Sequence, residues 1–408
     1  MESMPPDEMS QTTSARWLNT AAHAAFVPIG IVTVLLGPLL PTLSARWSLN
    51  YLQAGSLFTA QFLGSTLGVV VSGVLVSRWG FRFAINAGLL VMAVGVGTLP
   101  FSSRVLGLIC ISCYGLGLGL AIPAINLFVA DVNPKRRSAA LSLLNFSWSV
   151  GAVACPFVVA AAVRLDHIQL FLLMLAGFLL LVFLGILAVP FIFVAPATAP
   201  KQERPDSSLF RWNRRSLFVL AALFFLYVGT ENGFGGWIAS YAKSLGSSSP
   251  TLPVMTPSFF YAALMLGRWL APFVLRKTGE IRAAQSGLSI ACLGMVGLVL
   301  SRTMPLVVTS VSVAGLGLAA VYPITISRLS QEFGPAATRA GSVMFTMANL
   351  GGACLPWVVG YSSQRLNDLR AGLAVPLAAT LVMYALYRGN PGSAGVQVQV
   401  GRLPEPLK

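Results

Sequence analysis

The sequence predicts an all-α membrane protein in which twelve transmembrane helices form two pseudo-symmetric six-helix bundles. Composition is the first reason. Of the 408 residues, 56% are hydrophobic and 10% are charged, whereas soluble domains contain about 25% charged residues. The second reason is that apolar segments of about 20 residues, the length that crosses roughly 30 Å of hydrocarbon, recur along the whole chain. The third is that the two halves of the chain repeat each other.

The apolar segments divide the chain into five regions. Residues 1–18 are polar and mildly acidic, and we expect them to form a disordered cytoplasmic tail without a cleavable signal peptide. We expect a first bundle over 19–194, a polar Pro-rich linker over 195–214, a second bundle over 215–388 and a cytoplasmic tail over 389–408. The twelve predicted spans are 19–41, 52–77, 83–101, 105–131, 138–162, 168–194, 215–243, 254–276, 283–301, 304–331, 338–362 and 369–388.

The repeat between the halves is visible in matching glycines and prolines. The segment Gly115–Pro123, GLGLGLAIP, matches Gly315–Pro323, GLGLAAVYP, at an offset of 200 residues. Gly80 matches Gly279 at an offset of 199. A near-constant offset over most of each half indicates that a six-helix unit was duplicated.

The positive charges predict the orientation. Of the 27 Lys and Arg, 19 fall near the span ends on one side, seven on the other, and Arg268 lies inside a span. Because cytoplasmic connections carry the excess of Lys and Arg, both termini are expected in the cytoplasm, in a plasma membrane or a bacterial inner membrane. The net charge of +15 does not indicate a nucleic-acid partner, since the basic residues lie in short turns rather than on one soluble face.

The connection after the second span, Gly73–Arg82, reads GVLVSRWGFR. It resembles the loop signature of the major facilitator superfamily, Gly-x-Leu-Ala-Asp-Arg-x-Gly-Arg-Arg/Lys, although Ser77 stands where that family usually has Asp. The resemblance implies an inner latch of charges that forms when the cavity opens outward and breaks when it opens inward. In the expected cytoplasmic gate, Asp131 pairs with Arg78 or Arg82, and Glu332 pairs with Arg276 or Arg282. The alternative is that these charges only anchor helix ends at the lipid headgroups.

Within that superfamily, three stretches are similar to the fucose-permease-like branch of sugar symporters. They are Asn133–Trp148 with its following Gly and Pro, the Glu231–Trp237 segment, and the matching region Arg339–Pro356. This resemblance implies a small sugar as the transported molecule.

Glu231 is the one acid that lies clearly away from the ends of the spans. It falls about 14 residues into an apolar segment, or roughly 21 Å along a helix axis. A carboxyl group at that depth is costly and usually faces a cavity on an ion or substrate path. We expect Glu231 to take up and release the coupling proton, with sodium as the alternative coupling ion. The alternative role for Glu231 is that of a structural partner for Arg268. The repeat sets Val32 opposite Glu231 at the offset of 199, so coupling is expected in the second half only.

Polar and aromatic residues at comparable depth are candidates for the substrate site. A sugar needs donors and acceptors for its hydroxyl groups and an aromatic face for the apolar side of its ring. The predicted substrate-binding residues are Gln61, Asn126, Asn145, Trp148, Asn232, Trp237, Tyr322 and Asn349. For Trp237, the alternative is that it only flanks the cavity. The alternative for each Asn or Gln is that it forms a hydrogen bond between helices.

Taken together, these residues predict a secondary active transporter, acting as a monomer, that imports a small polyhydroxylated solute such as a monosaccharide with a proton. The alternative is a proton-coupled exporter of drugs or metabolites, because Gly151-x-x-x-Cys155-Pro156 partly resembles the antiporter motif of efflux proteins. An enzyme is not expected, since no nucleophile, base and oxyanion arrangement is visible. No cofactor or metal is expected either, and the five cysteines lie inside apolar segments.

Overall fold

The computed structural model describes residues 6–133, 137–188, 214–246, 249–333 and 337–389, with side chains given for all of these except 6–19, 137–139, 337–339 and 342. Those residues contain helices and no strand. The helices of the first half are α1 (Pro6–Val34), α2 (Leu36–Arg46), α3 (Tyr51–Thr98), the short 3₁₀ helix η1 (Leu99–Phe101), α4 (Arg104–Val132), α5 (Arg137–Arg164) and α6 (Ile168–Ala188). Those of the second half are α7 (Arg214–Ser244), α8 (Leu252–Thr278), α9 (Glu280–Leu300), α10 (Met304–Leu318), α11 (Val321–Phe333), α12 (Ala337–Leu366) and α13 (Leu369–Gly389).

These helices provide twelve crossings, which confirms the predicted fold class. α1 and α2 form one span that bends by 43° between Val34 and Leu36, and α10 with α11 forms another. α3 and η1 together contain 51 residues. A straight helix of that length would measure roughly 77 Å, more than twice the thickness of the hydrocarbon core. α3 reverses at Gly80, where the backbone is not helical, and so supplies two spans.

Gly80 and Gly279 show that the repeat extends to backbone conformation. Gly80 has φ 80° and ψ 172°, and Gly279, between α8 and α9, has φ 75° and ψ 159°. This region of backbone space is open essentially to glycine alone. The two matching connections therefore turn in the same way, as expected for a duplicated unit.

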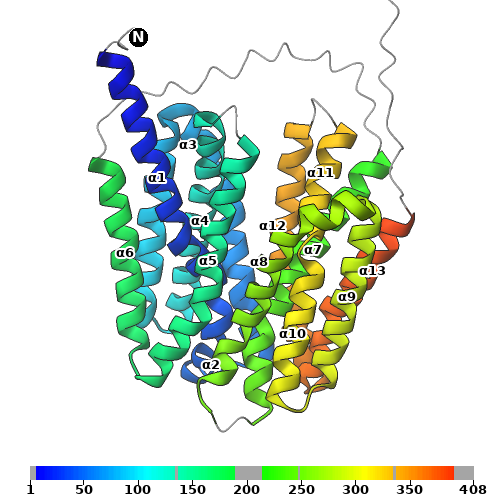
Figure 1. Cartoon of the computed structure of the whole chain (residues 1–408). Coiled ribbons are helices and arrows are strands. Elements are labelled where there is room, and N and C mark those ends of the chain that lie inside the picture. Colours follow the sequence, from blue (N-terminus) through cyan, green and yellow to red (C-terminus); the bar gives the residue numbers. More distant parts are fainter. Residues whose placement is uncertain (1–5, 134–136, 189–213, 247–248, 334–336, 390–408) are drawn as a thin grey trace, which may run out of the picture.

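The two bundles lie side by side, α1 to α6 from blue to green and α7 to α13 from green to red (Figure 1). They touch through α5 on α8, α2 on α7 and α3 on α12. Backbones approach closely there, since a Cβ on Gly37 would lie 3.2 Å from the Cα of Gly236. The shared boundary is where a site between the bundles would form.

Hydrogen bonds between the bundles gather at the end where α2 lies, the bottom of Figure 1. The backbone N–H of Tyr51 donates to Oε1 of Gln364 at 3.1 Å, and the hydroxyl of Thr59 donates to the carbonyl of Ala353 at 2.9 Å. The hydroxyl of Ser258 donates to the carbonyl of Val153 at 2.9 Å. These bonds join the bundles at the end where few Lys and Arg lie, and we call this the closed end.

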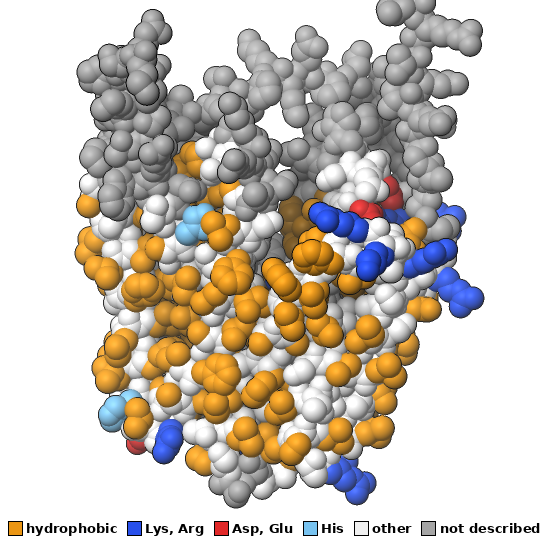
Figure 2. Space-filling model, viewed as in Figure 1, with side chains coloured by type: hydrophobic (Ala, Val, Ile, Leu, Met, Phe, Trp, Pro, Cys, Tyr) orange, Lys and Arg blue, Asp and Glu red, His pale blue; other side chains and the backbone are white. Residues whose placement is uncertain are grey.

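The surface matches a lipid-embedded protein. Large hydrophobic side chains are exposed along the helices, among them Leu293 at 71% and Val105 at 70%. On the face in Figure 2, hydrophobic side chains cover the middle, and most of the Lys, Arg, Asp and Glu lie toward the upper right and the lower edge. Such a distribution buries apolar surface in hydrocarbon and leaves charges at the two interfaces.

The span boundaries differ from the predicted ones at several ends. α1 begins at Pro6, so much of the region expected as a disordered tail is helical. α2 extends the first span to Arg46 instead of residue 41. Apart from Arg214 and Gly389, the predicted linker 195–214 and tail 389–408 lie outside the described residues.

Candidate functional site

The only ion pair between different helices in the described part of the chain joins Glu231 of α7 to Arg268 of α8. Nη2 of Arg268 lies 3.7 Å from Oε2 of Glu231, and the side chains are 25% and 13% exposed, respectively. Glu231 lies roughly 26 Å from the start of a helix that is roughly 46 Å long, which places the pair near mid-membrane. The pair is loose, since charge-assisted hydrogen bonds measure about 2.7–2.9 Å.

Two tyrosines extend this pair toward α11. Tyr227 lies one helical turn before Glu231, and its hydroxyl accepts a hydrogen bond from Nη2 of Arg268 at 3.5 Å. The ring of Tyr227 stacks on the ring of Tyr322, with centroids 5.3 Å apart. The structure thus brings Tyr322, a predicted substrate residue, into the group around Glu231.

Trp148 connects the pair to the first bundle. Cζ of Arg268 lies 5.9 Å from the centroid of the Trp148 ring on α5, a distance at which a cation is attracted to the ring face. Nε1 of Trp148 donates to the hydroxyl of Thr33 on α1 at 3.3 Å. Arg268 therefore contacts groups of both bundles at once.

Gln61 supports this arrangement from inside the first bundle. Its Nε2 donates to the carbonyl of Thr33 at 3.0 Å, and its Oε1 accepts from the hydroxyl of Tyr114 at 3.2 Å. The side chain is buried. Both ends of the amide form hydrogen bonds to neighbouring helices. Gln61 therefore positions Thr33 and joins helices, instead of offering a free group to a ligand.

Three of the predicted asparagines share one conformation. Each donates its Nδ2 to the carbonyl one turn earlier in its own helix: Asn126 to Ile122 at 2.8 Å, Asn145 to Leu141 at 2.8 Å and Asn232 to Val228 at 2.9 Å. None of the three side chains is buried. Their Oδ1 atoms accept no hydrogen bond from the described residues, and so remain available to donors of a ligand. Asn349 on α12 is partly exposed as well.

Trp237 does not belong to this group. Its ring is 1% exposed, and its Nε1 donates to the carbonyl of Pro356 at 3.0 Å. Tyr51 and Phe58 of the first bundle lie against it, with ring centroids at 6.2 and 6.4 Å. Trp237 thus packs the bundles together at their closed end, more than one helical turn beyond Glu231, and its position lends no support to the prediction that it binds the substrate.

Sequence reasoning missed Thr33 and Tyr227, and assigned Arg268 mainly to structure. Two signals were available. Tyr227 is four residues before Glu231 and so shares its helix face, and Thr33 matches Asn232 at the offset of 199. For Arg268 the sequence offers its depth inside a span, but only the packing of α5 on α8 sets it against Trp148.

The predicted gate is not assembled in this conformation. Asp131 is exposed and forms no ion pair with Arg78 or Arg82 within the described segments, while Nη2 of Arg82 donates to the carbonyl of Leu187. An unformed pair at Asp131 is what the latch hypothesis expects for a cavity open at this end.

In the second half the gate pairing differs from the prediction. Glu332 pairs with Arg328, four residues earlier in α11, at 2.9 Å, and not with Arg276 or Arg282. Both of those arginines are exposed. The physical reason is that residues four apart on a helix are neighbours, so Arg328 is already within reach.

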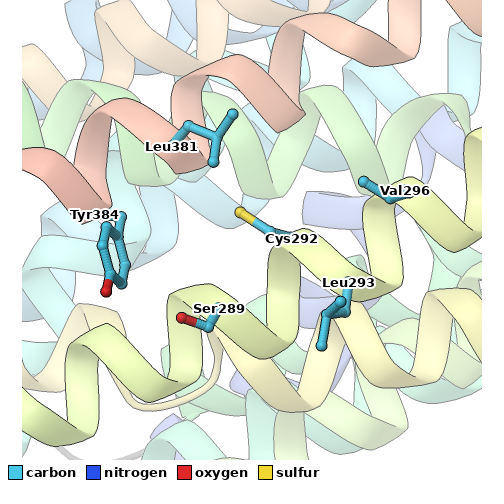
Figure 3. Close-up of a pocket in the computed structure, with 6 residues that line it drawn as sticks. All are labelled: Ser289, Cys292, Leu293, Val296, Leu381 and Tyr384. Carbon is cyan, nitrogen blue, oxygen red and sulfur yellow. The ribbon is translucent and has the colours of Figure 1, made fainter.

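Two cavities lie away from this group. One, of about 340 Å³, is lined by Ser289, Cys292, Leu293, Val296, Leu381 and Tyr384 of α9 and α13 (Figure 3). Its walls include exposed apolar residues, so it opens toward the lipid side. The other, of about 300 Å³, lies at the closed end beside Tyr51, Trp237 and Lys243. Neither contains Glu231 or Arg268, and no cluster of metal-binding residues occurs among the residues described.

Comparisons with known proteins agree with this architecture. The sequence profile of the Major Facilitator Superfamily matches residues 23–394. The chain is 24% identical over 404 residues to the sodium-dependent glucose transporter 1A of Mus musculus, covering 90% of this chain and 94% of that protein. It is 26% identical over 366 residues to a glucose/galactose transporter of Brucella abortus, covering 84% and 86%.

Solved structures share the fold at lower identity. A point mutant of the nucleoside transporter NupG superposes with a TM-score of 0.76 and 14% identity, covering 91% of this chain and 99% of that one. The transporter FucP in its outward conformation gives a TM-score of 0.64 and 19% identity, covering 92% and 99%.

Proposed function

The chain belongs to the major facilitator superfamily of membrane transporters, and from that premise we propose that it imports a monosaccharide together with a proton by alternating access. It is a transporter and not an enzyme. Relatives named for glucose and galactose support a sugar as the solute.

The observation that carries the proposal is the partly exposed pair of Glu231 and Arg268 at mid-membrane, beside Trp148 and Tyr322. The acid lies 3.7 Å from a cation and is partly exposed, so solvent reaches it. The aromatic rings and the free Oδ1 atoms of the asparagines supply the apolar face and the acceptors that a sugar requires.

The closed end is the one with fewer Lys and Arg, which we assign to the outside. In this orientation the hydrogen bonds that join the bundles lie at the outer end, and Asp131 forms no ion pair with Arg78 or Arg82 in the described segments. Both observations support an inward-open conformation. Opening the outer side would require the contacts around Trp237 to separate while the inner latch forms. Both termini then lie in the cytoplasm, and the transporter acts as a monomer.

The test uses purified protein in lipid vesicles with a panel of neutral and acidic monosaccharides. Glu231→Gln is expected to continue exchanging preloaded sugar but to lose accumulation driven by a pH gradient, because the amide cannot load a proton. Asp166→Asn is the matched control: it removes an exposed carboxylate at a position with φ 56°, which Asn tolerates.

Gradient-driven accumulation by Glu231→Gln at the wild-type level would contradict the coupling role. A sodium gradient applied at equal pH provides the comparison ion, since one relative is named as sodium-dependent. Uptake driven by sodium alone would replace the proton in the proposal. A parallel panel of lipophilic cations separates import of sugars from the export alternative.

A further inference from the structure

The guanidinium of Arg268 is left largely unused by the protein. It offers five N–H donors, yet among the described residues only its Nη2 makes polar contacts, to the hydroxyl of Tyr227 at 3.5 Å and to Glu231 at 3.7 Å. Its Nε and Nη1 donate to no residue in the described ranges, and the side chain is 25% exposed. A cation inside a membrane protein with free donors toward solvent is suited to an acceptor-rich group of a ligand.

The asparagines among the predicted substrate residues have the opposite polarity. The amides of Asn126, Asn145 and Asn232 use their donors on their own helices and keep Oδ1 available. Acceptors of this kind bind the hydroxyl hydrogens of a sugar. The predicted site residues therefore offer acceptors for hydroxyl groups and, at Arg268, several donors together.

The charge of the Glu231–Arg268 pair favours an acidic sugar over a neutral one when Glu231 is protonated. With Glu231 ionised, Glu231 and Arg268 sum to zero. When Glu231 takes up a proton, Arg268 is left without a counter-charge at mid-membrane, which is unfavourable. A neutral sugar does not compensate this charge, whereas a carboxylate does and can bind a guanidinium in a bidentate manner.

We propose that the transported molecule is a monosaccharide that carries one carboxylate, a sugar acid, and that its carboxylate takes the place of Glu231 on Arg268 once Glu231 is protonated. This rests on the proposed function, which it narrows to one class of sugar. The Trp148 ring lies 5.9 Å from the same guanidinium, so the bound sugar acid contacts both bundles.

The same exchange explains why proton and substrate move together. Two carboxylates compete for one guanidinium, so an ionised Glu231 weakens binding of the sugar acid. Protonation removes the competitor and strengthens it, and linkage requires that the sugar acid in turn favours protonation. One positive and one negative charge then cross the membrane together, so the transport step is electroneutral.

The experiment compares D-glucuronate with D-glucose, which differ only by a carboxylate in place of a hydroxymethyl group. In vesicles containing wild-type protein, glucuronate is expected to bind at least about tenfold more tightly, the size of one charge-assisted interaction. Its affinity should fall as pH rises. Proton-driven uptake of glucuronate should not respond to an imposed membrane potential.

Variants of Arg268 test whether this residue causes the preference for glucuronate over glucose. Arg268→Gln is expected to bring the ratio of the two affinities to about one, while Arg268→Lys keeps part of the preference because the charge remains. Arg365→Gln, which removes an exposed arginine stacked on Tyr361 far along α12, is the matched control and should keep the full ratio.

The outcomes are distinct. The assignment of a sugar acid is overturned if the wild type exchanges glucose and binds it as tightly as glucuronate or more tightly. It is also overturned if Arg268→Gln leaves the ratio of the two affinities unchanged. Either result leaves monosaccharide transport intact. If neither probe is exchanged in counterflow, this inference and the proposed function both fall.

Discussion

The two halves of the molecule have the same backbone plan but distribute their charges differently at mid-membrane. Glu231 and Arg268 of the second half correspond, at the offset of 199, to Val32 and Val69 of the first. Val32 is fully buried, whereas the ion pair remains partly exposed. The first half thus packs with apolar residues where the second half holds its charges.

The ends of the bundles repeat this contrast. In the first half, Phe81 packs edge-on against Phe128, with centroids 6.0 Å apart. At matching positions the second half has Glu280 and Arg328. Glu280 accepts a hydrogen bond from the hydroxyl of Ser327 at 2.7 Å.

The difference teaches that duplication preserved the turns and the close helix contacts, while the polar chemistry diverged. In the first half the mid-membrane polar groups Thr33 and Gln61 bond mainly to the protein itself. In the second half Arg268 keeps unused donors. In the proposed mechanism, the group that changes protonation therefore belongs to the second bundle only.

The largest expected effect comes from giving the second half the apolar residues of the first. Glu231→Val and Arg268→Val should each destabilise the protein by about 2 kcal/mol, below the ~3–5 kcal/mol of a fully buried pair because solvent reaches both groups. The double variant removes both charges and should recover most of that loss. Thermal unfolding of the purified protein measures this, and transport should be absent in all three variants.

A double variant as unstable as the sum of the two singles would show that the pair is not a self-contained unit. The contrast between the halves would then lie in the surrounding packing and not in the two charges.

The second largest effect is expected at the glycine turns that the two halves share. Gly80→Ala and Gly279→Ala should each cost about 1–3 kcal/mol, because φ of 80° and 75° with extended ψ is restricted to glycine. Gly177→Ala in α6, where an added Cβ meets nothing within 4 Å, is the control and should be neutral or up to ~1 kcal/mol stabilising. Unequal losses at the two matching turns would limit the equivalence of the halves.

The smallest effect concerns the end of α11. Glu332→Gln should cost about 1 kcal/mol, because the amide oxygen still accepts a hydrogen bond from Arg328 while that guanidinium, only 4% exposed, loses its counter-charge. A double-variant cycle on melting temperature should couple Glu332 to Arg328 and not to Arg276. Coupling to Arg276 would restore the predicted gate contact in the second half.

Much of the fold follows from patterns in the chain. Apolar runs of membrane length, the constant offset and the matching glycines predict twelve spans in two related bundles, and α3 with its reversal at Gly80 agrees. The helix ends were harder to predict. The start of α1 at Pro6 is one example, since a polar helical extension has no apolar pattern to mark it.

The candidate site was predictable only in part. Depth along the chain singles out Glu231, because lipid makes an isolated acid costly wherever the helix is placed. Depth does not distinguish Trp148, which faces Arg268, from Trp237, which is buried against Pro356. Both are tryptophans at plausible positions, and their roles depend on which neighbouring helix they meet.

By itself, the sequence determined that this chain spans the membrane twelve times, that its halves are duplicates and that one carboxylate lies deep in the second. These properties depend on local hydrophobicity and on spacing along the chain. Only the tertiary structure decided that Arg268 lies between Glu231 and Trp148, that Gln61 is used internally and that Glu332 pairs within its own helix. Contacts between helices depend on rotation and crossing, which hydrophobic periodicity does not encode to the precision of a hydrogen bond.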